Sequence, residues 1–351
     1  MTYRTCVRNF ILAMMMFVSF NYVVWRLFTE QLLSDQYGVG GNLARLAYIV
    51  DSKYPRWQNT DLPKKHISFG DYHGQQVDIV TIGDSFSTGS GEGRNRYYQD
   101  YIASLNNMSV LNLEEFKRGA GPFMTAITLL NSGLLDKIHP KVLILESVER
   151  SSIERFSKEI DFTETSSIND ICKFYNKPKT KVNYLEKDHF INNSNFKYIF
   201  YKIAYLFSDT PTEEVIRKKL SRAMFSVKND SILLFVNGDI KSIQRVTPES
   251  VKKLNDNINL FSKMLQTKGI KLYFMPAVDK YDLYREYIVD NPYPKNIFFE
   301  ELSKLPKQYE FIDTKKILHN AVMCGEKDIY YADDTHWNWR ASELIFSQVH
   351  F

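Results

Sequence analysis

Two short segments near opposite ends of the chain carry the residue types that nucleophilic catalysis requires. The first is the run Val-Asp-Ile-Val-Thr-Ile-Gly-Asp-Ser that ends at Ser85, and the second contains Asp333, Asp334 and His336. A serine hydroxyl attacks a carbonyl only when a neighbouring base removes its proton, and an imidazole oriented by a carboxylate is such a base. The two segments therefore predict a triad in which Ser85 is the nucleophile and His336 is the general base.

The elements around these segments follow a regular order that predicts an α/β domain. Short β-branched or apolar runs predict strands at 77–82, 110–113, 142–145, 270–275 and 309–312. Apolar periodicity and start signals predict helices at 97–105, after 119–122, at 247–265, 295–305 and 338–348. This alternation implies right-handed crossovers and a mainly parallel sheet. Ser85 is then expected where the first strand turns into a helix, whose first N–H groups can hold an oxyanion.

The N-terminus is apolar enough to suggest a membrane segment. The run 10–25 is almost unbroken, Arg4 and Arg8 precede it, and Arg26 follows. Its extension to Phe28 approaches the ~20 residues that cross a bilayer. Because bulky residues occupy the place of a cleavage site, we predict an uncleaved anchor over residues 1–30, with the rest of the chain outside the cytoplasm. A cleaved signal peptide and a buried or interfacial helix remain as alternatives.

The rest of the chain divides into three parts. Residues 31–75 contain scattered Gly and Pro and predict a membrane-proximal connector without chemistry of its own. Residues 76–351 form the α/β domain. Within it, residues 151–245 interrupt the alternation and predict an insertion or cap, with helices at about 194–207 and 212–225.

Composition excludes some functions. The net charge of +4 over 351 residues, without a Lys/Arg block, argues against nucleic-acid binding. Cys6, Cys172 and Cys324 lack the spacing of a zinc site, so we predict neither a metal nor another cofactor. Cys172 and Cys324 either form one disulfide or stay as two thiols.

Four motifs together resemble those of the SGNH/GDSL hydrolase superfamily. They are Gly-Asp-Ser at Ser85, Glu-Ser-Val-Glu-Arg ending at Arg150, Pro-Ala-Val-Asp-Lys-Tyr ending at Tyr281, and Asp-x-His followed by Trp337. The tryptophan narrows the resemblance to the branch of the alginate O-acetylation proteins (AlgX/AlgJ type) and the DHHW-type proteins. The resemblance implies a three-layer α/β/α fold and covers about 77–150 and 247–350.

The resemblance also implies roles for individual residues. In the usual SGNH spacing Asp333 orients His336, whereas the Asp-x-His-Trp pattern selects Asp334; we favour Asp334 and leave Asp333 to cap the turn. The oxyanion hole is expected to use the Ser85 N–H with an N–H of Gly119 or Gly121, although the two glycines fit a simple turn equally well.

Four further residues are expected to bind substrate, and two of them, Arg150 and Trp337, have a structural alternative. Arg150 contacts an oxyanion or a substrate carboxylate, or else forms an internal ion pair. Lys280 and Tyr281 follow a late strand, at the edge where open α/β sheets bind ligands. Trp337 stacks on a sugar ring or packs the closing turn.

By this resemblance the protein is a membrane-anchored carbohydrate O-acyltransferase, with acetyl as the acyl group and an exported or cell-surface polysaccharide as acceptor. A multispanning membrane acyltransferase is the expected donor partner. An esterase with the same triad and a non-catalytic polysaccharide-binding component are the alternatives. The sequence departs from the family pattern in two ways. The serine precedes the Asp-x-His-Trp motif, which weakens the inference that alginate is the substrate, and the asparagine of the third SGNH block is absent, which favours the non-catalytic alternative.

Overall fold

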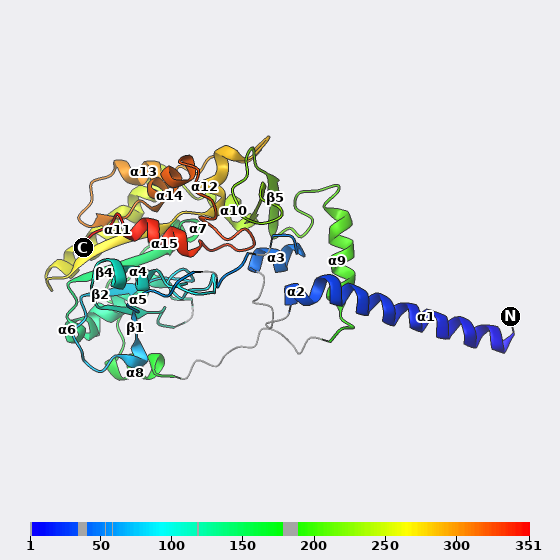
Figure 1. Cartoon of the computed structure of the whole chain (residues 1–351). Helices are drawn as coiled ribbons and strands as arrows, with labels where there is room; N and C mark the ends of the chain where they lie inside the picture. The colour runs from blue at the N-terminus through cyan, green and yellow to red at the C-terminus, as the bar shows by residue number, and fades with distance from the viewer. Residues whose placement is uncertain (1, 34–40, 53, 58, 118, 178–188) are drawn as a thin grey trace.

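A six-stranded parallel sheet organises the chain (Figure 1). The computed structural model describes residues 2–33, 41–52, 54–57, 59–117, 119–177 and 189–351. The strand order is β1-β3-β2-β4-β7-β8, and every pair is parallel. The strands are β1 (Ile67–Ser68), β2 (Ile79–Ile82), β3 (Val110–Leu113), β4 (Val142–Val148), β7 (Lys271–Ala277) and β8 (Glu310–Phe311). The predicted α/β class and mainly parallel sheet are confirmed.

Helices cover both faces of this sheet. The residues of β2, β3 and β4 are all buried, as expected for strands that are enclosed on both sides. One group of helices that pack together is α4 (Tyr98–Leu105), α14 (Thr314–Met323) and α15 (Trp339–Phe346). The other is α5 (Gly121–Asn131), α7 (Glu149–Phe156) and α11 (Pro248–Gln266). Shorter helical segments are α6 (Leu134–Ile138), α12 (Lys280–Tyr284), α13 (Phe298–Lys304), η3 (Phe69–Asp71) and η4 (Arg285–Tyr287).

Local start signals explain several of these bounds. α11 begins where the sequence predicts, because the Thr247 side chain accepts from the Ser250 N–H and Pro248 occupies the first turn. The closing helix α15 begins after Asn338, whose side chain accepts from the Arg340 N–H. This cap fixes the end of the loop that carries His336.

The segment between α7 and α11 is partly different from its prediction. It contains α8 (Ile168–Tyr175), α9 (Asn193–Ala204), β5 (Val215–Lys219), β6 (Ile232–Val236) and α10 (Asn237–Ile243). The prediction of a helix near 194–207 matches α9. The prediction of a helix at 212–225 is wrong: β5 and β6 form an antiparallel hairpin, and Val215 is buried against α3 (Asn42–Ala47).

The N-terminus is a long helix that projects from the body of the protein (Figure 1). α1 (Tyr3–Val24), the π-helical turn η1 (Trp25–Thr29) and α2 (Glu30–Leu33) follow one another without a break. The stretch Tyr3–Leu32 is 30 residues long and apolar enough to cross a membrane.

The three cysteines Cys6, Cys172 and Cys324 are free thiols. Of the two alternatives for Cys172 and Cys324, the structure therefore shows two thiols.

Candidate active site

The structure brings Ser85 and His336 into direct contact. His336 Nε2 lies 2.8 Å from Ser85 Oγ, although 251 positions separate the two residues in the chain. Ser85 follows β2, and His336 lies in the loop before α15, so both side chains reach the carboxyl edge of the sheet. This distance is that of a hydrogen bond between a nucleophile and its general base.

Asp334 is the carboxylate that contacts the imidazole. Its Oδ1 lies 2.6 Å from His336 Nδ1 and accepts from the His336 backbone N–H at 3.0 Å. Burial acts to raise the pKa of Asp334, but the charge and hydrogen bonds of His336, together with Arg56, outweigh burial and hold the pKa at about 2. Asp334 is therefore ionised at neutral pH and fixes the tautomer in which Nε2 can accept the serine proton.

Asp333 has a different partner. Arg56 Nη1 and Nη2 donate to its two carboxylate oxygens at 3.0 and 2.8 Å, and the N–H groups of Gly41 and Tyr54 also donate to it. The Asp333 side chain is fully buried by this arrangement. The geometry thus separates the two carboxylates: Asp334 orients the histidine, and Asp333 fixes the loop in place.

Sequence reasoning missed the contribution of the segment before the sheet. Residues 31–75 were expected to be a connector without chemistry, yet Arg56 binds Asp333, and Asn42 contacts the loop at Thr335 and Asp334. Gly41 packs so closely that a Cβ there would lie 2.2 Å from the Asp333 carbonyl oxygen. No spacing rule connects these positions with residues 333–336, so the sequence holds no local signal for them.

The turn that carries Ser85 is held in place by the buried carboxyl group of Glu146. Residues 85–90 form turns, and the predicted helix directly after the serine is wrong, because α4 begins only at Tyr98. Glu146 Oε2 accepts from the Asp84 N–H at 2.9 Å and from the Ser87 hydroxyl at 2.8 Å. Burial, together with the charge of the nearby Asp84, raises the pKa of Glu146 well above its usual value and so favours the neutral form of this side chain. A Cβ at Gly83 would lie 2.0 Å from Ser87 Oγ, which explains the glycine.

Ser85 faces a cavity of about 440 Å³. Its wall includes His336 and the polar side chains of Asn42, Arg45, Glu92 and Arg150. Within the described residues, no group accepts a hydrogen bond from the Ser85 N–H, which leaves this donor for an oxyanion. The arrangement therefore offers what nucleophilic catalysis requires: a hydroxyl, an imidazole in contact with it and a backbone N–H without an acceptor among the described residues, all beside a polar cavity.

Arg150 lies at this cavity but is also tied to internal acids. Its Nη1 lies 2.6 Å from Asp279 and 3.5 Å from Asp239, and about a fifth of the side chain is exposed. The internal ion pair, one of the two alternatives for Arg150, is thus present, and the exposed part of the side chain lines the cavity; a contact with substrate stays a prediction.

Gly119 and Gly121 do not line the cavity with Ser85. Both have positive φ values, +87° and +77°, so glycine is favoured there by the backbone conformation. Burial raises the pKa of Glu115, and hydrogen bonds from these two backbone N–H groups act against that rise. Of the two alternatives for these glycines, the backbone conformation supports the turn, which lies beside Glu115.

Tyr281, predicted to bind substrate, is instead a buried packing residue, and for Trp337 the structure shows the packing alternative rather than an exposed ring. The Tyr281 hydroxyl donates to the carbonyls of Tyr293 and Pro294. The Trp337 ring packs edge-on against Phe86 with centroids 4.7 Å apart. Since both side chains are 5% exposed or less, neither offers a face to a sugar.

Lys280 is also buried, and it binds the loop that carries His336 rather than a substrate. Its Nζ donates to the carbonyls of Tyr331, Ala332 and Asp334 at 2.7, 3.1 and 3.0 Å. An ammonium has three N–H bonds and satisfies all three acceptors. Lys280 is thus a positioning residue for the loop that carries His336, and the substrate-binding prediction for it is wrong.

We expect Lys280→Met to lower the rate at which Ser85 reacts with a fluorophosphonate by about 10- to 100-fold, because three buried carbonyls lose their donor and the loop loses its order. The measurement is the rate constant of covalent labelling, beside Lys304→Met, which removes an exposed lysine of α13. Equal rates in the two variants would show that Lys280 does not position the loop.

Lys280 also predicts a dependence of stability on pH. Burial lowers its pKa to about 7, below the usual lysine range. Between about pH 7 and about pH 10 the unfolded chain therefore binds a proton that the folded chain has lost, so the free energy of unfolding should rise with pH in that window. Denaturant titrations of wild type should show a steeper rise than those of Lys280→Met, and parallel curves would contradict this assignment.

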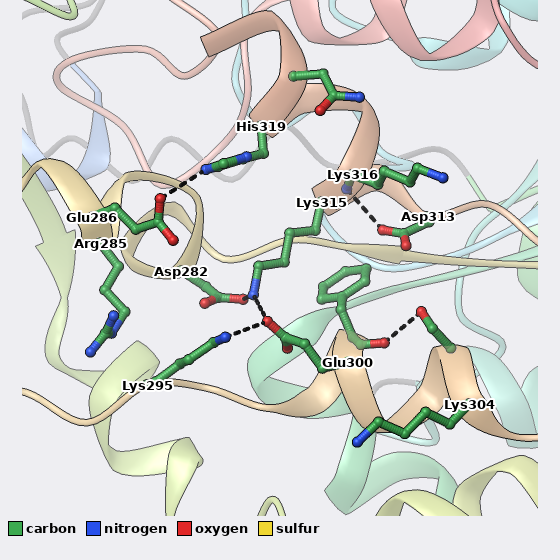
Figure 2. Close-up of a pocket in the computed structure, with 13 residues that line it drawn as sticks. Asp282, Arg285, Glu286, Lys295, Glu300, Lys304, Asp313, Lys315, Lys316 and His319 are labelled. Carbon is green, nitrogen blue, oxygen red and sulfur yellow. Dashed lines mark hydrogen bonds and ion pairs between the residues drawn. The ribbon is translucent and has the colours of Figure 1, made fainter. Parts of the chain in front are cut away.

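A second cavity, of about 510 Å³, lies between α12, α13 and α14 (Figure 2). Several of its charged side chains pair with one another: Lys315 lies 2.7 Å from Asp282, Lys295 lies 3.0 Å from Glu300, and His319 contacts Glu286. The Ser303 hydroxyl at this cavity donates to the Phe299 carbonyl rather than to a histidine, so Ser85 is the better candidate for a nucleophile. Among the described residues, no group of three His, Cys, Asp or Glu side chains could hold a metal ion.

Comparison with known proteins does not identify the family of this chain. No family model matches the chain, and no curated protein is significantly similar to it. The chemistry of the site therefore rests on the arrangement of Ser85, His336 and Asp334.

Proposed function

We propose that the protein is a serine-dependent carbohydrate O-acyltransferase, with acetyl as the acyl group, and that α1 anchors it in a membrane with the α/β domain outside the cytoplasm. The observation that carries this proposal is the continuous contact from Asp334 through His336 to Ser85. Such a connection activates a hydroxyl for attack on a carbonyl.

The reaction follows from these contacts. Ser85 Oγ attacks the acyl carbonyl carbon while its proton passes to His336 Nε2, and Asp334 stabilises the imidazolium that forms. The Ser85 N–H donates to the developing oxyanion. His336 then protonates the leaving oxygen, and the acyl group remains on Ser85. In the second half, an acceptor hydroxyl loses its proton to His336 and attacks the acyl-serine. The bond between the acyl carbon and Ser85 Oγ then breaks, and His336 returns the proton to Ser85 Oγ.

The polar cavity supports a carbohydrate as acceptor. Asn42, Arg45 and Glu92 offer donors and acceptors of hydrogen bonds close to the nucleophile, which suits a molecule rich in hydroxyls. Water in place of the sugar would give an esterase with the same residues. The resemblance to the alginate O-acetylation proteins favours transfer to an exported or surface polysaccharide, with a multispanning membrane acyltransferase as donor partner.

The test uses the full chain in detergent with an aryl acetate as acyl donor and defined oligosaccharides as acceptors. We expect mass spectrometry to find an acetyl group on the peptide that contains Ser85, and its disappearance to match the appearance of acetylated oligosaccharide. Loss of acetyl to water alone, at a rate unchanged by any sugar, would establish the esterase instead. A folded chain that neither gains acetyl nor reacts with a fluorophosphonate would overturn catalysis and favour a polysaccharide-binding role.

A further inference from the structure

The helix α9 exposes a row of large apolar side chains. Phe196, Phe200, Ile203 and Phe207 follow one another at steps of four, three and four residues, which places them on one face of the helix and its final turn. Phe200 is 65% exposed and Phe207 is 85% exposed. We call these four residues the α9 stripe. An aligned row of this kind differs from scattered surface hydrophobics and indicates a surface that has a partner.

The opposite side of α9 is fixed to the helix that begins the chain. Asn195 Nδ2 donates to Asn21 Oδ1 at 2.8 Å, and the Thr29 hydroxyl donates to Asn195 Oδ1 at 2.5 Å. The rings of Tyr198 and Phe28 stack with centroids 4.8 Å apart. Since Asn21 and Asn195 are fully buried, this contact holds α9 and α1 in one orientation.

The stripe lies on the side of α9 that faces the exposed part of α1. Phe196 contacts Phe20 and Phe17, with ring centroids 5.0 and 6.2 Å apart, and these residues precede the buried Asn21. Figure 1 shows α9 crossing α1 near the point where α1 leaves the body. The apolar surface of α1 therefore meets the α9 stripe at Phe196, the first of its four residues.

Distances along α1 give the depth below the membrane surface at which Phe20 contacts α9. At ~1.5 Å per residue, the helix between Arg8 and Arg26 is ~27 Å long, close to the ~30 Å of a bilayer core. Phe20 lies six residues before Arg26, or ~9 Å inward along the same axis. Amphipathic helices that lie in a membrane surface bury their apolar face by ~5–10 Å.

From this geometry we propose that α9 is an interfacial helix whose stripe inserts into the outer leaflet of the lipid bilayer beside α1. The proposal rests on α1 being a membrane anchor, as proposed above. Lipid is the expected partner of the stripe, because the acyl chains that surround a membrane-spanning α1 would also reach the adjacent stripe. Lys197 and Lys202, both exposed, lie to either side of the stripe, where lysines of interfacial helices meet lipid phosphates. Two contacts with the membrane, rather than one, hold the cavity of Ser85 at a fixed height and orientation.

The test measures the surroundings of α9 directly. The full chain, with Cys6, Cys172 and Cys324 changed to serine, is placed in nanodiscs of phosphatidylcholine and phosphatidylglycerol. Single variants Phe200→Cys and Ile203→Cys carry a nitroxide label, and the readout is its relaxation by oxygen and by a water-soluble nickel complex. Leu12→Cys on α1 reports lipid, and Leu260→Cys, an exposed apolar position of α11, reports water.

We expect the oxygen-to-nickel ratio at positions 200 and 203 to exceed that at position 260 severalfold and to approach that at position 12. A ratio equal to that of position 260 would overturn the proposal, as would labels that are shielded from both reagents, which indicate a protein contact. A water-like ratio at position 12 as well would show that α1 is not in the membrane, and would overturn the anchor together with this inference. Fluorophosphonate labelling of the same samples reports the triad separately, so its loss does not affect the readout of α9.

Discussion

We expect Ser85→Ala to lower the rate of acetyl transfer by about 10⁶-fold, because the variant retains the cavity but has no nucleophile. His336→Ala should lose a similar amount, since the hydroxyl then has no base to remove its proton. The measurement is transfer of acetyl from an aryl acetate to an oligosaccharide at saturating donor.

The double variant provides the decisive comparison. Ser85→Ala with His336→Ala should be no slower than either single variant, because the two residues act as one unit. Thr88→Ala is a matched control that removes a nearby hydroxyl of the same turn. Activity retained within tenfold in Ser85→Ala would contradict the acyl-serine mechanism.

The two adjacent aspartates should give opposite phenotypes. Asp334→Asn should lower the rate of transfer by about 10⁴-fold with little change in stability, because the amide favours the wrong tautomer of His336. The measurement is the same transfer assay, beside a denaturant titration of each variant.

Asp333→Asn should instead lower the free energy of unfolding by about 3–5 kcal/mol, because it leaves the buried Arg56 without its closest ion-pair partner and with only the more distant Asp334, at 3.6 Å. Arg56→Met together with Asp333→Asn should recover part of that loss, since the double variant has no unpaired buried charge. A strong loss of activity with unchanged stability in Asp333→Asn would reverse the assignment of the two carboxylates.

Much of the scaffold was predictable because its signals are local. The β-branched runs around Ile79 and Val142 predicted buried parallel strands, and the cap at Thr247 predicted the start of α11 correctly. These features depend on side chains within a few residues of one another. By contrast, Val215 lies in a strand only because a hairpin packs it against α3, which no local pattern discloses.

The pairing of Ser85 and His336 was predictable by residue type, but the surroundings of the two residues were not. The chain order alone does not show that Arg56 contacts Asp333, because the interaction spans 277 positions. For Lys280 a local signal misled the prediction. Its position after a strand suggested that it binds substrate, but its ammonium points inward and donates to backbone carbonyls. Position at a strand end predicts proximity to a site, and burial decides whether the side chain reaches it.

The contacts of Arg56 and Gly41 determine at which residue an expressed fragment of the protein can begin. A fragment that begins at residue 76, the start of the sheet domain by sequence, would lack both partners of the Asp333 loop and should fold poorly or be inert. A fragment that begins at Gly41 retains these partners and omits the apolar helix. The segment that precedes the first central strand is therefore a structural part of the α/β domain, and shortening it to improve solubility would remove the contacts that hold the loop of His336 in place.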